Sequence, residues 1–125
     1  MILDTNALSA FVDGDRALGD VLRRQPRAAI PVIVLGEFRY GIGLSQHRVT
    51  YEKWLQANLP RFEILDVTED TTLAYATVRL ALKNSGRPIP ANDAWIAALA
   101  LQHELPILSR DRHFDVLGGI SRVEW

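Results

Sequence analysis

Residues 92–111, NDAWIAALALQHELPILSRD, decide the fold of this chain. Their pattern predicts a buried helix over Asn92–Glu104, apolar nearly all round, and directly after it a short strand over Pro106–Ser109. Because the strand begins where the helix ends, the helix must start at the opposite, carboxyl edge of the sheet. Asp93 opens the helix and Asp111 follows the strand, so we expect both carboxylates at that edge.

The rest of the chain also alternates short apolar strands with helical patterns. Further strands are predicted over Met1–Asp4, Arg27–Ile30, Phe62–Val67 and Arg122–Trp125. Further helices are predicted over Ala7–Asp13, Asp15–Gln25, Pro31–Leu44, His47–Leu59 and Thr68–Asn84. This alternation predicts an α/β fold, with one domain over residues 1–125 and a short central parallel β-sheet flanked by helices on both faces. Ligands in such folds bind outside the carboxyl ends of the strands.

Composition limits the classes of function. The chain has no cysteine, which excludes disulfides and thiolate metal sites. A net charge of -1 is not that of a protein that holds nucleic acid by overall attraction, so nucleic acid would need a local basic patch. No apolar run reaches the roughly 18 residues of a membrane helix, and no signal-peptide pattern precedes the first strand. We therefore expect a cytoplasmic protein with no membrane contact.

Four carboxylates stand apart from the other acids, and each also has an ordinary structural explanation. Asp4, after the first strand, could cap the helix that begins near Ala7. Asp93 could stabilise the positive end of its own helix. Asp111 could form ion pairs within its loop. Glu37 has no basic neighbour at helical spacing, so it is either a solvated side chain or a carboxylate on an apolar face that needs a partner.

Taken together, these carboxylates predict a cation site. Like charges ~4 Å apart repel by about 4 kcal/mol per pair at an effective dielectric near 20. Such a cluster persists only when protons or cations neutralise it. Without cysteine, the all-oxygen ligand set indicates Mg²⁺ or Mn²⁺, and a hard divalent cation of this kind is suited to cleaving phosphodiesters.

Four motifs resemble those of the PIN domain, and more narrowly of VapC-type toxins of bacterial toxin–antitoxin pairs. The motifs are LDTN (3–6), GEFRYG (36–41), NDAWIAALA (92–100) and LSRDRHFD (108–115). The acidic positions of the family match Asp4, Glu37, Asp93 and Asp111. Its common polar neighbours of the acids match Thr5, Asn6 and Ser109, and Asp115 is a weaker candidate of the same kind. The resemblance implies a metal-dependent endoribonuclease that forms a homodimer and is neutralised by a small antitoxin protein.

The expected reaction is hydrolysis of an RNA phosphodiester. We expect Asp4, Asp93 and Asp111 to hold one or two Mg²⁺ or Mn²⁺ ions. Glu37 is expected to orient or deprotonate the attacking water, or to complete a second metal site. A basic rim is expected to contact the RNA, and its candidates are Arg110, Arg112, His113, Arg39, Lys83 and Arg87.

Three other interpretations of an acidic site are open. A haloacid-dehalogenase-like phosphatase needs a second acid two residues after the first, where this chain has Asn6. A receiver domain, which is a signalling module, needs a lysine late in the chain, and none follows Lys83. A PIN domain of RNA maturation or DNA flap cleavage would share the site but usually carries extra segments.

The partner protein is expected to bind an apolar groove of the amino-terminal half. The candidate apolar residues are Leu8, Phe11, Val12, Leu18, Val21, Leu22, Phe38, Tyr40 and Trp54. A groove between short helices can accept an amphipathic helix of another chain.

Overall fold

The computed structural model describes all 125 residues, and its centre is a sheet of five parallel strands. In chain order these are β1 (Ile2–Leu3), β2 (Ala29–Pro31), β3 (Glu63–Leu65), β4 (Ile107–Leu108) and β5 (Arg122–Val123). Their order across the sheet is β3-β2-β1-β4-β5, and every neighbouring pair is parallel. The strand that begins the chain is therefore central, and its carboxyl end lies beside that of β4.

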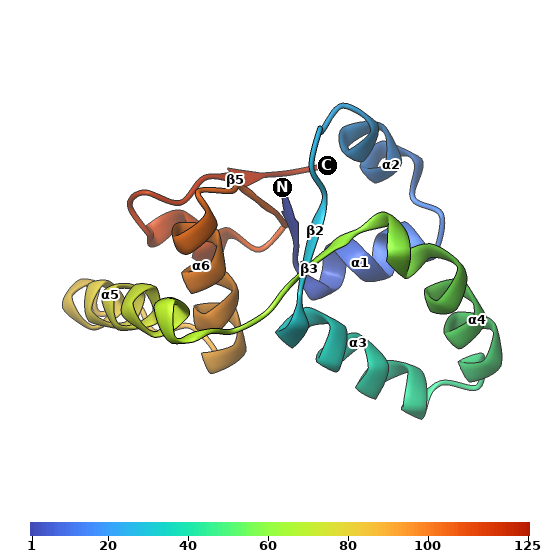
Figure 1. Ribbon diagram of the computed structural model, residues 1–125. Coiled ribbons are helices and arrows are strands. Elements are labelled where there is room, and N and C mark those ends of the chain that lie inside the picture. Colours follow the sequence, from blue (N-terminus) through green and yellow to red (C-terminus); the bar gives the residue numbers. More distant parts are fainter.

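Helices cover both faces of the sheet, as predicted. They are α1 (Thr5–Val12), α2 (Arg16–Arg23), α3 (Val32–Leu44), α4 (Arg48–Asn58), α5 (Glu69–Ser85) and α6 (Ala91–His103). Two short 3₁₀ segments follow α4 and β4, namely η1 (Leu59–Arg61) and η2 (Arg112–Val116). Figure 1 shows α5 and α6 together on one side of the strands, with α1, α3 and α4 on the other. No helix combines the length and the apolar character needed to cross a membrane.

The core lies where α6 packs on the central strands. Ile2 and Leu3 of β1 and Ile107 and Leu108 of β4 are fully buried, and α6 buries nearly every residue from Ala94 to Ala100. Each large apolar side chain removed from water contributes about 1.5–3 kcal/mol. The all-round apolar pattern of α6 is thus explained, because the helix lies between the sheet and α5.

Local chemistry explains where the elements begin and end. The side chain of Asp4 accepts a hydrogen bond from the Ala7 N–H at 2.7 Å, so α1 begins at Thr5, two residues earlier than predicted. Thr68 and Thr71 form a reciprocal cap at the start of α5, and Gly86 ends that helix at a positive φ of 66°. Pro31 is the last residue of β2 and precedes α3, whereas the sequence placed it inside the helix.

The predicted strands are all too long. Phe62–Val67, for example, shortens to the three residues of β3, because Asp66 and Val67 are exposed and lie beyond the ladder. The η2 segment was not predicted at all. Apolar patterns in a sequence identify the position of a strand, whereas the length of the strand depends on the neighbouring strand with which it pairs.

Several residues of the expected apolar surface of the amino-terminal half are buried instead. Leu8, Leu18 and Phe38 are buried in the core, and Phe11 packs edge-on against Trp54. Of the whole predicted set only Tyr40 is largely exposed, at 73%. Phe11 and Leu22 are still accessible, because they line a groove of about 250 Å³.

Candidate active site

Asp4 lies at the carboxyl end of β1 and uses both carboxylate oxygens. Oδ1 accepts the Ala7 N–H that caps α1, and Oδ2 accepts a hydrogen bond from the Ser109 hydroxyl. The side chain is almost completely buried, with 5% of the residue exposed. The structural explanation as a helix cap is therefore correct, but it accounts for only one of the two oxygens.

Ser109 connects two of the four acids. It is fully buried directly after β4, where its hydroxyl donates to Asp4 and accepts the Asp111 N–H at 2.9 Å. One side chain therefore sets the position of a buried carboxylate and of the backbone that carries another. The contact between Ser109 and Asp4 spans 105 positions of the chain.

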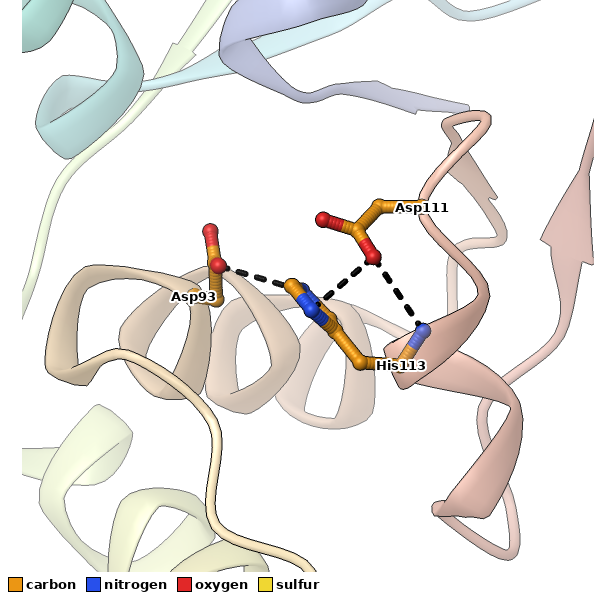
Figure 2. Close-up of side chains that lie close together, drawn as sticks. All are labelled: Asp93, Asp111 and His113. Carbon is orange, nitrogen blue, oxygen red and sulfur yellow. Dashed lines mark hydrogen bonds and ion pairs between the residues drawn. The ribbon is translucent and has the colours of Figure 1, made fainter.

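Asp93 and Asp111 face each other across the ring of His113 (Figure 2). His113 Nε2 lies 3.0 Å from Asp93 Oδ2, and Nδ1 lies 2.9 Å from Asp111 Oδ1. Asp111 Oδ1 also accepts the His113 N–H at 3.2 Å, which caps η2. The sequence assigned His113 to the RNA-contacting rim, but the structure places it inside the acidic site.

Glu37, on α3, faces the same region with an unsatisfied oxygen. Its Oε1 is buried and has no hydrogen-bond partner in the chain. An ionised carboxylate oxygen withdrawn from water without a partner is costly, so the site fits a donor or cation that the protein itself does not supply.

Burial and mutual repulsion act on two of these acids. Burial raises the pKa of Asp4 above its ordinary value, and the charge of Asp111 adds to the rise, while the hydrogen bonds from Ser109 and the Ala7 N–H oppose it. Burial also raises the pKa of Asp93; His113 opposes that rise, and Asp111, Glu37 and Asp4 add to it. Asp93 is therefore within electrostatic reach of the other three predicted acids.

The donor set fits a hard divalent cation. One ligand atom each from Asp93, Asp111 and His113 lies within 4.8 Å of the other two. Opposite ligands of an ion bound at 2.0–2.1 Å are ~4.2 Å apart, so only a small contraction is needed. The ligand atoms of this cluster do not include those of Asp4 or Glu37, which the sequence also assigned to the metal.

Asp115 contacts a basic side chain rather than the acids. Arg122 donates to its two oxygens at 2.7 and 3.0 Å, and this contact lowers the pKa of Asp115. The same guanidinium donates to the Ser109 carbonyl at 2.9 Å. Arg122, on β5, thus braces both ends of the segment that carries Asp111 and His113.

Only some of the basic side chains predicted to contact RNA are free to do so. Arg110 donates to the Trp125 carbonyl at 3.1 and 3.2 Å, and its guanidinium lies 4.5 Å from the centroid of that indole ring. Arg39 lines a separate cavity between α3, α4 and β3. Arg112, Lys83 and Arg87 are exposed, the first on η2 and the other two at or beyond the end of α5.

The polar neighbours expected around the acids have different positions. Ser109 bridges Asp4 and Asp111 as described. Thr5 lines a groove that it shares with Glu37, and Asn6 is exposed. Sequence reasoning missed Arg122 and the placement of His113, because no local pattern signals a contact that is made between a loop and a distant strand.

The fold and the site together define a PIN domain. The family model described as PIN domain matches residues 1–120, and this chain belongs to that family. Ribonuclease VapC5 of Mycobacterium tuberculosis is 33% identical over 130 aligned positions that cover 98% of this chain and 91% of the relative. Toxin FitB of Neisseria gonorrhoeae is 30% identical, with 89% of this chain and 87% of the relative covered.

A solved structure agrees over the whole length. A chain in the crystal structure of VapBC2 from Rickettsia felis, bound to a DNA fragment from its promoter, superposes with a TM-score of 0.91. Its sequence identity is 25%, and the match covers 99% of this chain and 97% of that one. The resemblance predicted from the four motifs is confirmed.

Proposed function

We propose that this protein is the ribonuclease toxin of a toxin–antitoxin pair, which hydrolyses RNA phosphodiesters with Mg²⁺ or Mn²⁺. The proposal takes the whole chain, residues 1–125, as one nuclease domain that acts in the cytoplasm, where its substrate is. The observation that carries it is the convergence of Asp4, Glu37, Asp93 and Asp111 at the carboxyl edge of a PIN domain, with Glu37 Oε1 buried and unpartnered. The names of the relatives support the toxin assignment.

In this proposal Asp93, Asp111 and Asp4 hold the metal, and His113 lies between the first two. A bound divalent cation supplies an activated water and charge stabilisation at a phosphate oxygen. Ser109 keeps Asp4 and the Asp111 backbone in place through its two hydrogen bonds.

Glu37 is proposed as the residue that orients or deprotonates the attacking water. Its carboxylate has an oxygen that no group of the chain occupies, and such a carboxylate can act as a general base toward water. The other acids are less suited to this role, because Asp4 already accepts two hydrogen bonds and Asp93 and Asp111 contact His113. Glu37→Gln should therefore abolish cleavage while a metal still binds.

RNA contacts are proposed for three exposed cations, Arg112, Arg87 and Lys83. The overall charge of -1 supplies no general attraction, so local cations must hold the phosphates. Arg110 is a weaker candidate than the sequence suggested, since Trp125 already holds its guanidinium.

Two protein partners belong to the proposal. The relatives in solved structures include toxin–antitoxin complexes, which supports a cognate antitoxin for this chain. A homodimer is supported by Leu73 and Leu80, which are 73% and 60% exposed. They lie seven residues apart on one face of α5, the spacing of a helix-packing stripe.

The deciding experiment incubates the purified protein with total RNA and Mn²⁺ or Mg²⁺. Cleavage should require the metal, stop with a chelator and disappear in Asp93→Asn. Asp66→Asn is the matched control, because Asp66 is exposed and lies outside the acidic site. Intact RNA with every divalent metal would overturn the nuclease assignment.

A second readout separates a toxin from an RNA-maturation enzyme. Expression of the wild-type chain should arrest growth, and co-expression of the protein encoded beside it should restore growth and block cleavage in vitro. Cleavage without growth arrest, and without inhibition by that neighbour, would favour RNA maturation.

A further inference from the structure

A groove of about 320 Å³ lies between α1 and α3, with Glu37 of the acidic site in its wall, and both polar side chains and the apolar Phe38 and Ile42 line it. On the α1 side it is lined by Thr5, Ser9 and Asp13, which follow one another at four-residue spacing and so share one helix face. Eight residues of helix rise about 12 Å. The groove therefore extends by that distance from the acidic site.

The α3 wall repeats the same spacing with Glu37, Gly41 and Ser45. The groove thus begins at the carboxylate to which we assign the attacking water. In Figure 1, α1, α3 and α4 lie together on the side of the sheet opposite α5 and α6. A chain lying across the acidic site can enter the groove directly.

The far end of the groove presents a fixed carboxylate and a fixed hydroxyl. Tyr51, on α4, donates to Asp13 Oδ1 at 3.2 Å, and its ring lies edge-on to Phe38 at 6.4 Å between centroids. The charge of Asp13 raises the pKa of Tyr51, so the hydroxyl stays protonated at neutral pH. Asp13 is exposed and lines the groove, and its second oxygen accepts no hydrogen bond within the chain.

The lining selects against phosphate and for N–H donors. No lysine or arginine lines the groove, while Asp13 and Glu37 repel anions. The bases of single-stranded RNA can be recognised through their Watson–Crick edges. Guanine presents an imino and an amino N–H side by side, a pair that one carboxylate can accept together, whereas adenine and cytosine present only an amino group and uracil only an imino group.

We propose that this groove binds an unpaired guanine base of the RNA next to the cleaved bond, with Asp13 as the residue that recognises it. The inference rests on the proposed ribonuclease function and names the base preference of that same site. About 320 Å³ lies at the lower end of the volumes of small-molecule sites, which suits one base with part of its ribose.

Gly41 offers a way to close the groove without disturbing the fold. A Cβ atom built there meets nothing within 4 Å, so a longer side chain projects into the open groove. Gly43, on the same helix, also has open space around its Cβ position but does not line the groove. Gly41→Gln and Gly43→Gln are therefore a matched pair, and both should favour the helix.

The first test is binding, without divalent metal and without cleavage. Guanosine 5′-monophosphate should shift the amide NMR signals of Asp13, Gly41 and Ser45, and the adenosine, cytidine and uridine monophosphates should need roughly tenfold higher concentrations, within the range of one bidentate base contact. Asp13→Asn should remove this preference, and Asp20→Asn, outside the groove, should keep it. Equal shifts with all four nucleotides, or shifts only outside the groove, overturn the proposal.

The second test maps RNA cleavage sites. Wild type and Gly43→Gln should cut beside guanine, and Gly41→Gln should lose the preference. Unchanged sites in Gly41→Gln, together with weaker inhibition by the antitoxin, would assign the groove to the protein partner and make the guanine assignment wrong. If the wild-type chain cuts no RNA at all, the proposed function fails, while the nucleotide titration still decides what the groove binds.

Discussion

Ser109→Ala tests whether one buried hydroxyl holds the acidic site together. The substitution removes a donor to the Asp4 carboxylate and an acceptor of the Asp111 N–H, while the side chain is fully buried. A hydrogen bond to a charged group contributes about 1.5–3 kcal/mol, and a neutral one about 0.5–1.5 kcal/mol. Because the Asp111 end is only partly buried, we expect a loss of about 2–4 kcal/mol in the free energy of unfolding.

The loss should depend on pH in a defined direction. The Ser109 hydrogen bond opposes the burial that raises the pKa of Asp4, so its removal raises that pKa further. A carboxyl group with a raised folded pKa stabilises the protein at low pH, and this stabilisation is lost as pH rises through the folded value. The difference between wild type and Ser109→Ala should therefore be smaller near pH ~4, around the ordinary pKa of aspartate, than near pH ~8.

Urea unfolding at the two pH values measures both effects. Ser121→Ala is the control, since Ser121 is exposed, and should change stability by less than about 0.5 kcal/mol. The acid limb of the pH–rate profile for RNA cleavage should move to higher pH in Ser109→Ala, because the metal-binding role proposed for Asp4 requires its ionised form. A stability change below about 0.5 kcal/mol, or one independent of pH, would refute the role assigned to this hydroxyl.

Three further predictions concern the metal, the bracing arginine and the dimer. Mn²⁺ should raise the free energy of unfolding of the wild type by mass action, by about 2.7 kcal/mol at 100 times the dissociation constant, and the urea midpoint should rise with it. In Asp93→Asn the urea midpoint of the metal-free protein should rise, because the raised pKa of Asp93 shows that its charge is destabilised in the folded state. Mn²⁺ should not raise this midpoint further, and a full Mn²⁺ response in this variant would contradict the ligand assignment. Arg122→Gln should weaken the binding of Mn²⁺, measured by calorimetry, because it removes the hydrogen bonds at both ends of the segment that carries Asp111. An unchanged affinity would show that these hydrogen bonds are not needed for metal binding. Leu73→Lys combined with Leu80→Lys should convert a dimer to a monomer in sedimentation at micromolar concentration, and a persistent dimer would move the interface off α5.

Much of the architecture was predictable because it depends on local patterns. The alternation of apolar strands and helices is a short-range signal, and it is confirmed. The Thr68 cap and the Gly86 end of α5 likewise depend only on neighbouring residues. The same patterns predicted that Asp4, Asp93 and Asp111 lie at one edge, since parallel strands bring their carboxyl ends together. Four motifs also identified the family to which the chain belongs.

The sequence by itself determined which residues could form an acidic site, because strand, helix and cap signals are encoded within a few neighbouring positions. Only the tertiary structure decided which side chains contact the acids of this site. In the fold, His113 lies between two carboxylates, and Ser109 donates a hydrogen bond to Asp4, 105 positions away in the chain. Arg110 contacts Trp125, whereas the sequence assigned it to RNA. Such contacts depend on strand register and on how loops pack, and both are set by long-range burial that leaves no periodic trace in the chain.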